Sequence, residues 1–197
     1  MVYESIVKQL ADNLSPGRFQ HSVRVSSMAE ELAETFGCDK QKARLAGLLH
    51  DIAREVPEKE LLLKAQALGI TVDTIEREEP LLLHAPVAAK LAESQFHIAD
   101  QEVLQAILLH TTGGRHMSLL AKVIYMADLI EPGRSFSGLE EIRELARQDL
   151  DQAMLMALNQ SISYLLRQRG LIHPDTIEAR NELLIAAGKK VRIEKED

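Results

Sequence analysis

The chain of 197 residues has no tryptophan and a single cysteine, and aromatic residues make up only 4 % of it. Its core must therefore be aliphatic, and the 46 % of hydrophobic residues is enough for a sizeable one. The lone Cys38 excludes an intramolecular disulfide framework. Because the N-terminal segment also lacks a basic start followed by an apolar run, we expect a reducing, cytoplasmic location.

Positive charge and long apolar runs are scarce as well. The 23 Lys and Arg residues are outnumbered by 30 Asp and Glu residues, which gives a formal net charge of −7. A nucleic-acid polymer is therefore not an expected partner, although a metal and a few arginines can form a local site for a nucleotide. No stretch of about 18 uninterrupted apolar residues occurs, so no membrane span is predicted.

Strand signals are also nearly absent, because alternation is not sustained and β-branched clusters are few. Leu and Ala dominate and favour helices. The helices are expected at roughly 2–12, 16–36, 40–53, 57–69, 71–79, 86–96, 100–110, 118–130, 139–147, 149–169 and 174–187. The sequence predicts one compact all-α domain over residues 1–188 and a charged tail over 189–197.

Several polar side chains stand out because the segments that carry them are strongly apolar. His50 and Asp51 close one such run, and Asp128 lies inside the apolar segment 123–130. His21, His84 and His110 also lie in apolar, helix-like segments. Burying such groups unpaired is costly, and a metal ion is the simplest partner that satisfies several of them together.

The residue types narrow the choice of metal. Histidine and aspartate without cysteine exclude a thiolate zinc finger and suit Fe, Mn, Co, Ni or catalytic Zn. A site of this kind leaves room for water, which the metal turns into a nucleophile near neutral pH. The remaining histidines, His97, His116 and His173, are expected to be solvated or to cap helices, with substrate contact as a minor option for His116.

The order of these residues resembles the HD-domain metal-dependent phosphohydrolase superfamily, which has an all-helical bundle fold. The resemblance runs from about Arg18 to Asp128. The finer motifs are similar to those of the bacterial YqeK group, and they comprise residues 18–22, 46–53, 83–86, 107–113 and 127–134. This resemblance implies symmetrical hydrolysis of diadenosine tetraphosphate to two ADP molecules, with one or two metal ions, iron favoured.

The resemblance also implies roles for individual residues. The metal ligands would be His21, His50, Asp51 and Asp128. Asp51 is also the catalytic candidate, because a ligand carboxylate can orient the attacking water. The expected phosphate contacts are Arg18, His84, His110, Thr111 and Arg134, and the two histidines alternatively hold a second metal.

Other functions stay open at this point. The nearest is another HD nucleotide phosphohydrolase: a nucleotidase, a deoxynucleotide triphosphohydrolase or a cyclic-nucleotide phosphodiesterase. A non-catalytic nucleotide-binding module is a different class, and a purely structural scaffold leaves the buried histidines and aspartates unexplained. The apolar segment 149–169 is expected to pack in the core, with a homodimer interface as the alternative.

Overall fold

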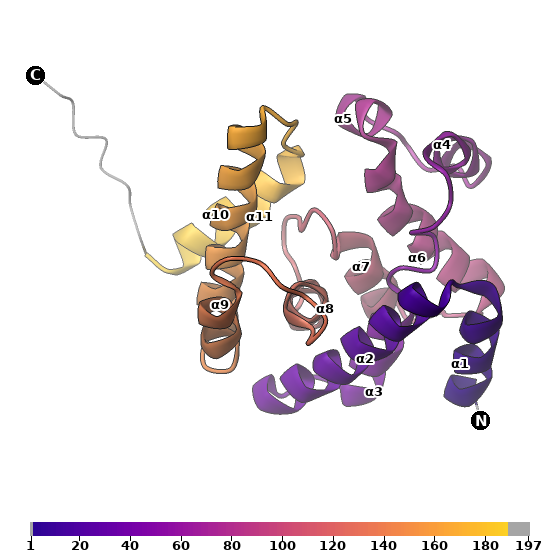
Figure 1. The fold of residues 1–197 in the computed structure, drawn as a ribbon, viewed down its shortest axis with the longest axis horizontal. Coiled ribbons are helices and arrows are strands. Elements are labelled where there is room, and N and C mark those ends of the chain that lie inside the picture. The colour runs from indigo at the N-terminus through magenta and orange to yellow at the C-terminus, as the bar shows by residue number, and fades with distance from the viewer. Residues whose placement is uncertain (1, 189–197) are drawn as a thin grey trace, which may run out of the picture.

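The computed structural model describes residues 2–188, and this part of the chain contains helices and no β-strand (Figure 1). The prediction of an all-α fold is confirmed. The predicted charged tail over 189–197 lies outside the described residues. Among the residues described, no helix combines the length and the apolarity needed to cross a lipid bilayer.

The helices follow one another with short connections. They are α1 (Val2–Asn13), α2 (Pro16–Phe36), α3 (Lys40–Leu49), α4 (Glu58–Ala67), α5 (Thr74–Glu78), the 3-10 helix η1 (Pro80–Leu83), α6 (His84–Gln95), α7 (Gln101–Leu109), α8 (Leu119–Ile130), α9 (Leu139–Ala146), α10 (Leu150–Gln168) and α11 (Pro174–Ala186). The side chains that cap α2, α3, α5, α7, α8 and α10 are Ser15, Asp39, Asp73, Asp100, Ser118 and Asp149. Each accepts backbone N–H groups that the first turn leaves unpaired.

Two predicted helix limits near the site are wrong. Helix α3 ends at Leu49, so His50 and Asp51 lie in the turn beyond it and not inside the helix. His84 was expected just before a helix, but it is the first residue of α6. Pro86 does not prevent this start, because the first backbone N–H groups of a helix have no intrahelical partner to lose.

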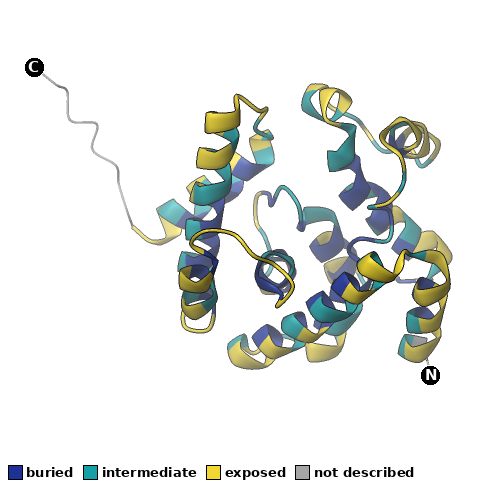
Figure 2. Ribbon diagram, viewed as in Figure 1, coloured by how far each residue is buried: buried dark blue, intermediate teal, exposed yellow. Residues whose placement is uncertain are grey.

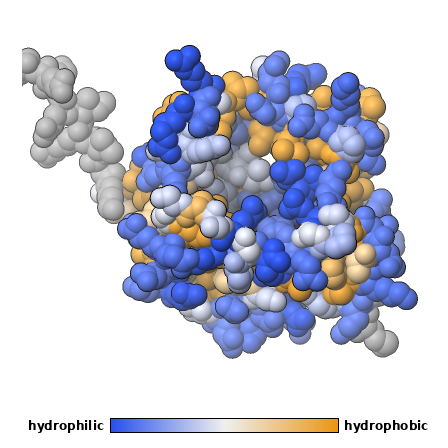
Figure 3. All heavy atoms as spheres, in the orientation of Figure 1, coloured by the Kyte–Doolittle hydropathy of each residue, from blue (hydrophilic) through white to orange (hydrophobic). Residues whose placement is uncertain are grey.

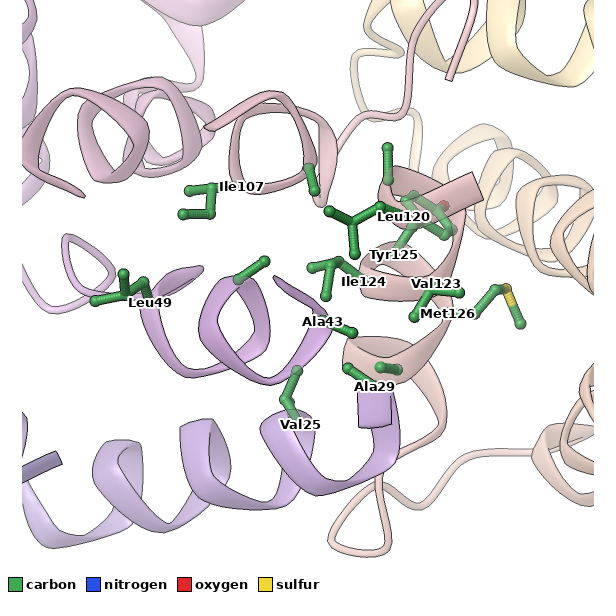
Figure 4. Close-up of a cluster of buried hydrophobic side chains, with 14 of the residues drawn as sticks. Val25, Ala29, Ala43, Leu49, Ile107, Leu120, Val123, Ile124, Tyr125 and Met126 are labelled. Atoms are coloured by element: carbon green, nitrogen blue, oxygen red, sulfur yellow. The ribbon is translucent and has the colours of Figure 1, made fainter. Parts of the chain in front are cut away.

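Helix α8 forms the centre of the bundle and packs against α2, α3, α7, α9 and α10 (Figure 1). Eight of its twelve residues are buried, and the burial pattern in Figure 2 shows neighbouring helices turning their buried faces toward it. The core is aliphatic, as predicted: Val25, Leu49 and Ile107 from α2, α3 and α7 belong to one cluster of buried side chains with Ile124 of α8 (Figure 4).

The expected core role of segment 149–169 holds for its first half. Met154, Leu155 and Leu158 are buried in the described structure. Toward the C-terminal end of α10 the side chains emerge, with Tyr164 56 % and Leu166 64 % exposed. This end of α10 leaves the core and approaches the cavity described below.

Helix α2, which carries His21, and helix α3, which His50 and Asp51 follow, approach closely at Gly47. A Cβ atom placed at Gly47 of α3 would lie 2.9 Å from Ser26 Cα of α2, a contact with backbone that cannot move aside easily. The α2–α3 packing therefore requires glycine here.

We expect Gly47→Ala to lower the free energy of unfolding by about 1–3 kcal/mol, because the added methyl group forces α2 and α3 apart. Gly17→Ala in the first turn of α2 is the control, since no heavy atom lies within 4 Å of its added Cβ. Chemical denaturation should show Gly17→Ala at wild-type stability or up to about 1 kcal/mol above it. Equal stability of the two variants would contradict this account of the packing.

Candidate metal centre and adjoining cavity

The site is assembled largely from the ends of helices. His50 and Asp51 directly follow α3, and His110 directly follows α7. Adjacent residues on a helix diverge by about 100°, so His50 and Asp51 can meet one ion only beside the helix end, where other helices complete the set of donors. His84 begins α6, His21 lies in the N-terminal part of α2, and Asp128 lies near the end of α8. Their side chains converge in overlapping groups of three whose possible ligand atoms lie within 4.8 Å of one another.

One half of the cluster contains the four residues that sequence analysis predicted as metal ligands. His21 Nε2 lies 3.0 Å from Asp128 Oδ1 and 3.5 Å from Asp51 Oδ2. His50 Nε2 lies 3.5 Å from Asp51 Oδ2 and 3.8 Å from Asp128 Oδ1. The two imidazole Nε2 atoms are 3.3 Å apart. Four potential donors thus converge on one small volume.

The other half uses the second oxygen of the same aspartate. Asp51 Oδ1 lies 3.3 Å from His84 Nε2 and 3.6 Å from His110 Nε2. These two nitrogens are 3.1 Å apart, and Thr111 Oγ1 lies within 3.1 Å of both. Asp51 therefore joins two sets of donors, one on each carboxylate oxygen.

All four imidazoles are oriented by a hydrogen bond on the opposite nitrogen. The Nδ1 atoms of His50, His84 and His110 donate to the carbonyl oxygens of Gly47, Leu81 and Ile107, and Nδ1 of His21 faces Glu131 Oε1. Because these acceptors fix the Nδ1–H tautomer, the Nε2 lone pairs point into the cluster. The Nε2 atoms of His21 and His50 are 3.3 Å apart, and those of His84 and His110 are 3.1 Å apart. At such distances their lone pairs repel one another unless a cation or a proton lies between them. The donor set therefore fits a metal ion.

The carboxylates reinforce this demand for positive charge. When the imidazoles carry protons on the nitrogens that face the cluster, burial raises the pKa of Asp51, but the charge of His50 and hydrogen bonds from His110, His50 and His84 together hold the net pKa well below its usual range. Burial likewise raises the pKa of Asp128, and the hydrogen bond from His21 together with the charges of His50 and Arg134 outweighs it. Burial lowers the pKa of His50, yet the charges of Asp51 and Asp128 and the hydrogen bonds to Asp51 and Gly47 together raise the net pKa. The cluster thus draws in a positive charge, whether a proton or a metal ion.

Two arginines predicted to bind phosphate lie at the site and contact its carboxylates. Arg18 Nη1 donates to Asp51 Oδ2 at 2.5 Å, and Arg134 Nη2 donates to Asp128 Oδ1 at 2.5 Å. Arg134 Nε also donates to the Asp128 carbonyl oxygen. Arg18 Nε is buried and has no hydrogen-bond partner within residues 2–188.

Glu131 is a supporting residue for which the sequence predicted no individual role. It is 1 % exposed and faces His21 Nδ1 at 3.1 Å. Arg24 Nε and the backbone N–H of Gly133 donate to its other oxygen at 2.5 Å. Burial raises its pKa, but the hydrogen bonds from Arg24, Gly133 and His21 together outweigh this and lower the pKa to about 2. The sequence does contain a signal for Glu131, namely a carboxylate at the end of an apolar helix. The same signal identified Asp51.

The cluster forms part of the wall of a cavity of about 470 Å³. Figure 3 shows a hollow near the middle of this face, between α10–α11 on one side and α5 on the other. The cavity is lined by Arg18, Asp51, Arg54, Glu79, Leu81, Leu82, His84, His110, Thr111, Thr112, Tyr125, Asp128, Leu129, Arg134, Ser161, Leu165, Gly170, Leu171, His173 and Thr176. Arg54 is a second residue that sequence analysis missed, since nothing in its local pattern shows which way it faces.

The three remaining histidines have different surroundings. His173 caps α11, as predicted, by accepting the backbone N–H of Asp175, and its Nε2 lies 3.2 Å from Asp73 Oδ2. His97 and His116 are exposed and have positive φ angles. His116 pairs with Glu182 and does not line the 470 Å³ cavity, which argues against substrate contact.

We expect Glu131→Gln to weaken metal binding by about 10–100-fold, because it removes the charge that orients His21 while keeping the side chain's shape. Titration of metal-free protein with Mn²⁺, followed by calorimetry, measures the change. Glu141→Gln, at an exposed position of α9, should bind as wild type does. Unchanged affinity in Glu131→Gln would show that Glu131 stabilises the fold only.

Comparison with known proteins agrees with this geometry. A model of the HD domain family matches residues 18–133. The chain is 40 % identical over 175 residues to a symmetrical bis(5'-nucleosyl)-tetraphosphatase of Halalkalibacterium halodurans, covering 88 % of this chain and 92 % of that one. It is 36 % identical over 181 residues to the enzyme of that name in Bacillus subtilis, covering 92 % and 97 %.

A solved structure has the same fold. A crystal structure from Clostridium acetobutylicum, described as an HD superfamily hydrolase involved in NAD metabolism, superposes with a TM-score of 0.91 at 40 % identity. The match covers 93 % of this chain and 97 % of that one. The resemblance found in the sequence is thereby confirmed, and the chain belongs to the HD domain family.

Proposed function

We propose that this protein is a metal-dependent hydrolase that cleaves diadenosine tetraphosphate symmetrically into two ADP molecules. The observation that carries the chemistry is Asp51, whose two oxygens each face a separate pair of histidine Nε2 atoms beside the cavity. The position of the cut is supported by the relatives named symmetrical tetraphosphatases.

The proposed first metal position is held by His21, His50, Asp51 and Asp128, as the sequence predicted. His84, His110 and the other oxygen of Asp51 would hold a second ion or contact phosphate. The ion, iron favoured with Mn, Co, Ni or Zn as alternatives, supplies Lewis acidity and an activated water when bound.

The chain's own residues position the substrate. Asp51 is placed to orient the attacking water, and Thr111 offers its hydroxyl beside His84 and His110. Arg18, Arg54 and Arg134 bring positive charge to a cavity in a protein of net charge −7. Water adds across the central P–O–P bond, so that each half leaves as ADP. Positioning and charge neutralisation carry most of the rate of such a reaction.

Product analysis tests the proposal directly. With Mn²⁺ or Fe²⁺, the wild-type protein should convert diadenosine tetraphosphate to ADP alone, while Asp51→Ala should lose activity by about 10³-fold or more and lose bound metal in elemental analysis. Asp12→Ala, at an exposed position, is the control. Release of ATP and AMP, or faster turnover of a mononucleotide or of NAD, would favour another HD phosphohydrolase. Binding without turnover with any metal would favour the non-catalytic module.

Arg54 is proposed as a further phosphate contact. Within residues 2–188 its guanidinium has no ion-pair or hydrogen-bond partner, whereas Arg18 and Arg134 are both engaged with carboxylates. It is therefore the cavity-lining arginine that binds phosphate without giving up an existing ion pair.

We expect Arg54→Ala to raise the KM for the dinucleotide about tenfold or more, because a charge-assisted hydrogen bond is lost. Steady-state kinetics with Arg147→Ala, an exposed arginine outside the cavity, provides the comparison. Matching KM values for the two variants would remove Arg54 from the phosphate site.

A further inference from the structure

One wall of the cavity is apolar and has no part in the metal centre. Helix α8 contributes Tyr125 and Leu129, α10 contributes Leu165, and the link between α10 and α11 contributes Leu171. Tyr125 and Leu129 lie four residues apart and so share a helix face with Asp128. The same face of α8 thus carries a predicted metal ligand and the start of an apolar surface.

Leu171 is the member of this wall whose exposure needs an explanation. Its side chain is 43 % exposed although it lines the cavity. A large apolar side chain that lines a cavity and is partly exposed gains stability when an apolar ligand covers it. Phosphate and metal ions do not provide such cover, so this wall suits a different part of a ligand.

Contacts at both ends of the link between α10 and α11 hold this wall in place. A Cβ atom at Gly170 would lie 3.3 Å from Leu165 Cδ2, so glycine lets the link lie tightly against α10. The link is also fixed at its far end, where His173 caps α11 and pairs with Asp73 at the start of α5. A wall held by such contacts spends little binding energy on ordering its side chains.

A few polar groups accompany the apolar wall. Ser161 and Thr176 line the cavity together with the buried Tyr125, whose hydroxyl is the third polar group there. Burial raises the pKa of Tyr125, so its hydroxyl stays protonated near neutral pH. An apolar surface with a small number of polar groups is typical of small-molecule binding sites.

We propose that the wall formed by Tyr125, Leu129, Leu165 and Leu171 is the subsite for the purine base of one nucleotide half. This inference rests on the proposed function and extends it from the phosphates to the nucleoside. The arginines and the metal centre hold the phosphate end, and the base covers Leu171 at the other wall. A volume of about 470 Å³ lies in the range that accommodates a nucleotide-sized ligand.

Two probes separate the base from the phosphates. Calorimetry on the Mn²⁺-loaded protein gives dissociation constants for ADP and for inorganic pyrophosphate, which has no base. Leu171→Ser should weaken ADP binding about tenfold and leave pyrophosphate binding within about twofold, because only the base contact is lost. Leu166→Ser is the matched control, since Leu166 is 64 % exposed on α10 and lies outside the cavity.

Leu165→Ala tests the same wall at a second residue and should give the same pattern. ADP binding that stays within about twofold of wild type in both wall variants, or an equal loss for ADP and pyrophosphate, would overturn the subsite. Failure of ADP to bind the wild-type protein would overturn it as well. The proposed hydrolysis is judged separately by product analysis, so a protein that binds ADP through this wall without cutting the dinucleotide refutes only the reaction.

Discussion

The rest of the site depends on the burial of one carboxylate. Asp51 is 3 % exposed, and each of its oxygens lies within 3.6 Å of two histidine Nε2 atoms. A buried, ionised carboxylate is stable only with positive partners close by. The imidazoles, Arg18 and the proposed metal are all consequences of this requirement, and so is the outer support of His21 by Glu131.

The fold meets this requirement through helix ends. Helix α3 stops at Leu49, which lets His50 and Asp51 turn toward the same volume, and α7 stops just before His110. The carbonyl oxygen three residues before each histidine accepts its Nδ1–H: Gly47 for His50, and Ile107 for His110. The same backbone groups that a helix end leaves unpaired thus orient the ligands. Gly47 contributes twice, by this carbonyl and by the close approach of α2.

The cavity combines two chemistries that come from different parts of the chain. Its charged wall is built by α2, the turn after α3 and the ends of α7 and α8, while its apolar wall comes from α8, α10 and the link to α11. Helix α8 belongs to both because it lies at the centre of the bundle and carries Asp128 beside Leu129. A nucleotide has the same division, with a charged phosphate end and an apolar base.

The sequence by itself determined the helices and the buried polar residues, because caps, breakers and apolar periodicity are local properties. Ser15-Pro16, Asp39, Asp100 and Ser118 mark their helix starts, and the histidines of apolar segments are the ones that converge. The tertiary structure alone decided how they are supported and what they face. Glu131 meets His21 across 110 residues of sequence, and Arg54 and Leu171, which are distant in the sequence, line one cavity. Such contacts depend on how whole helices pack, which no local pattern encodes.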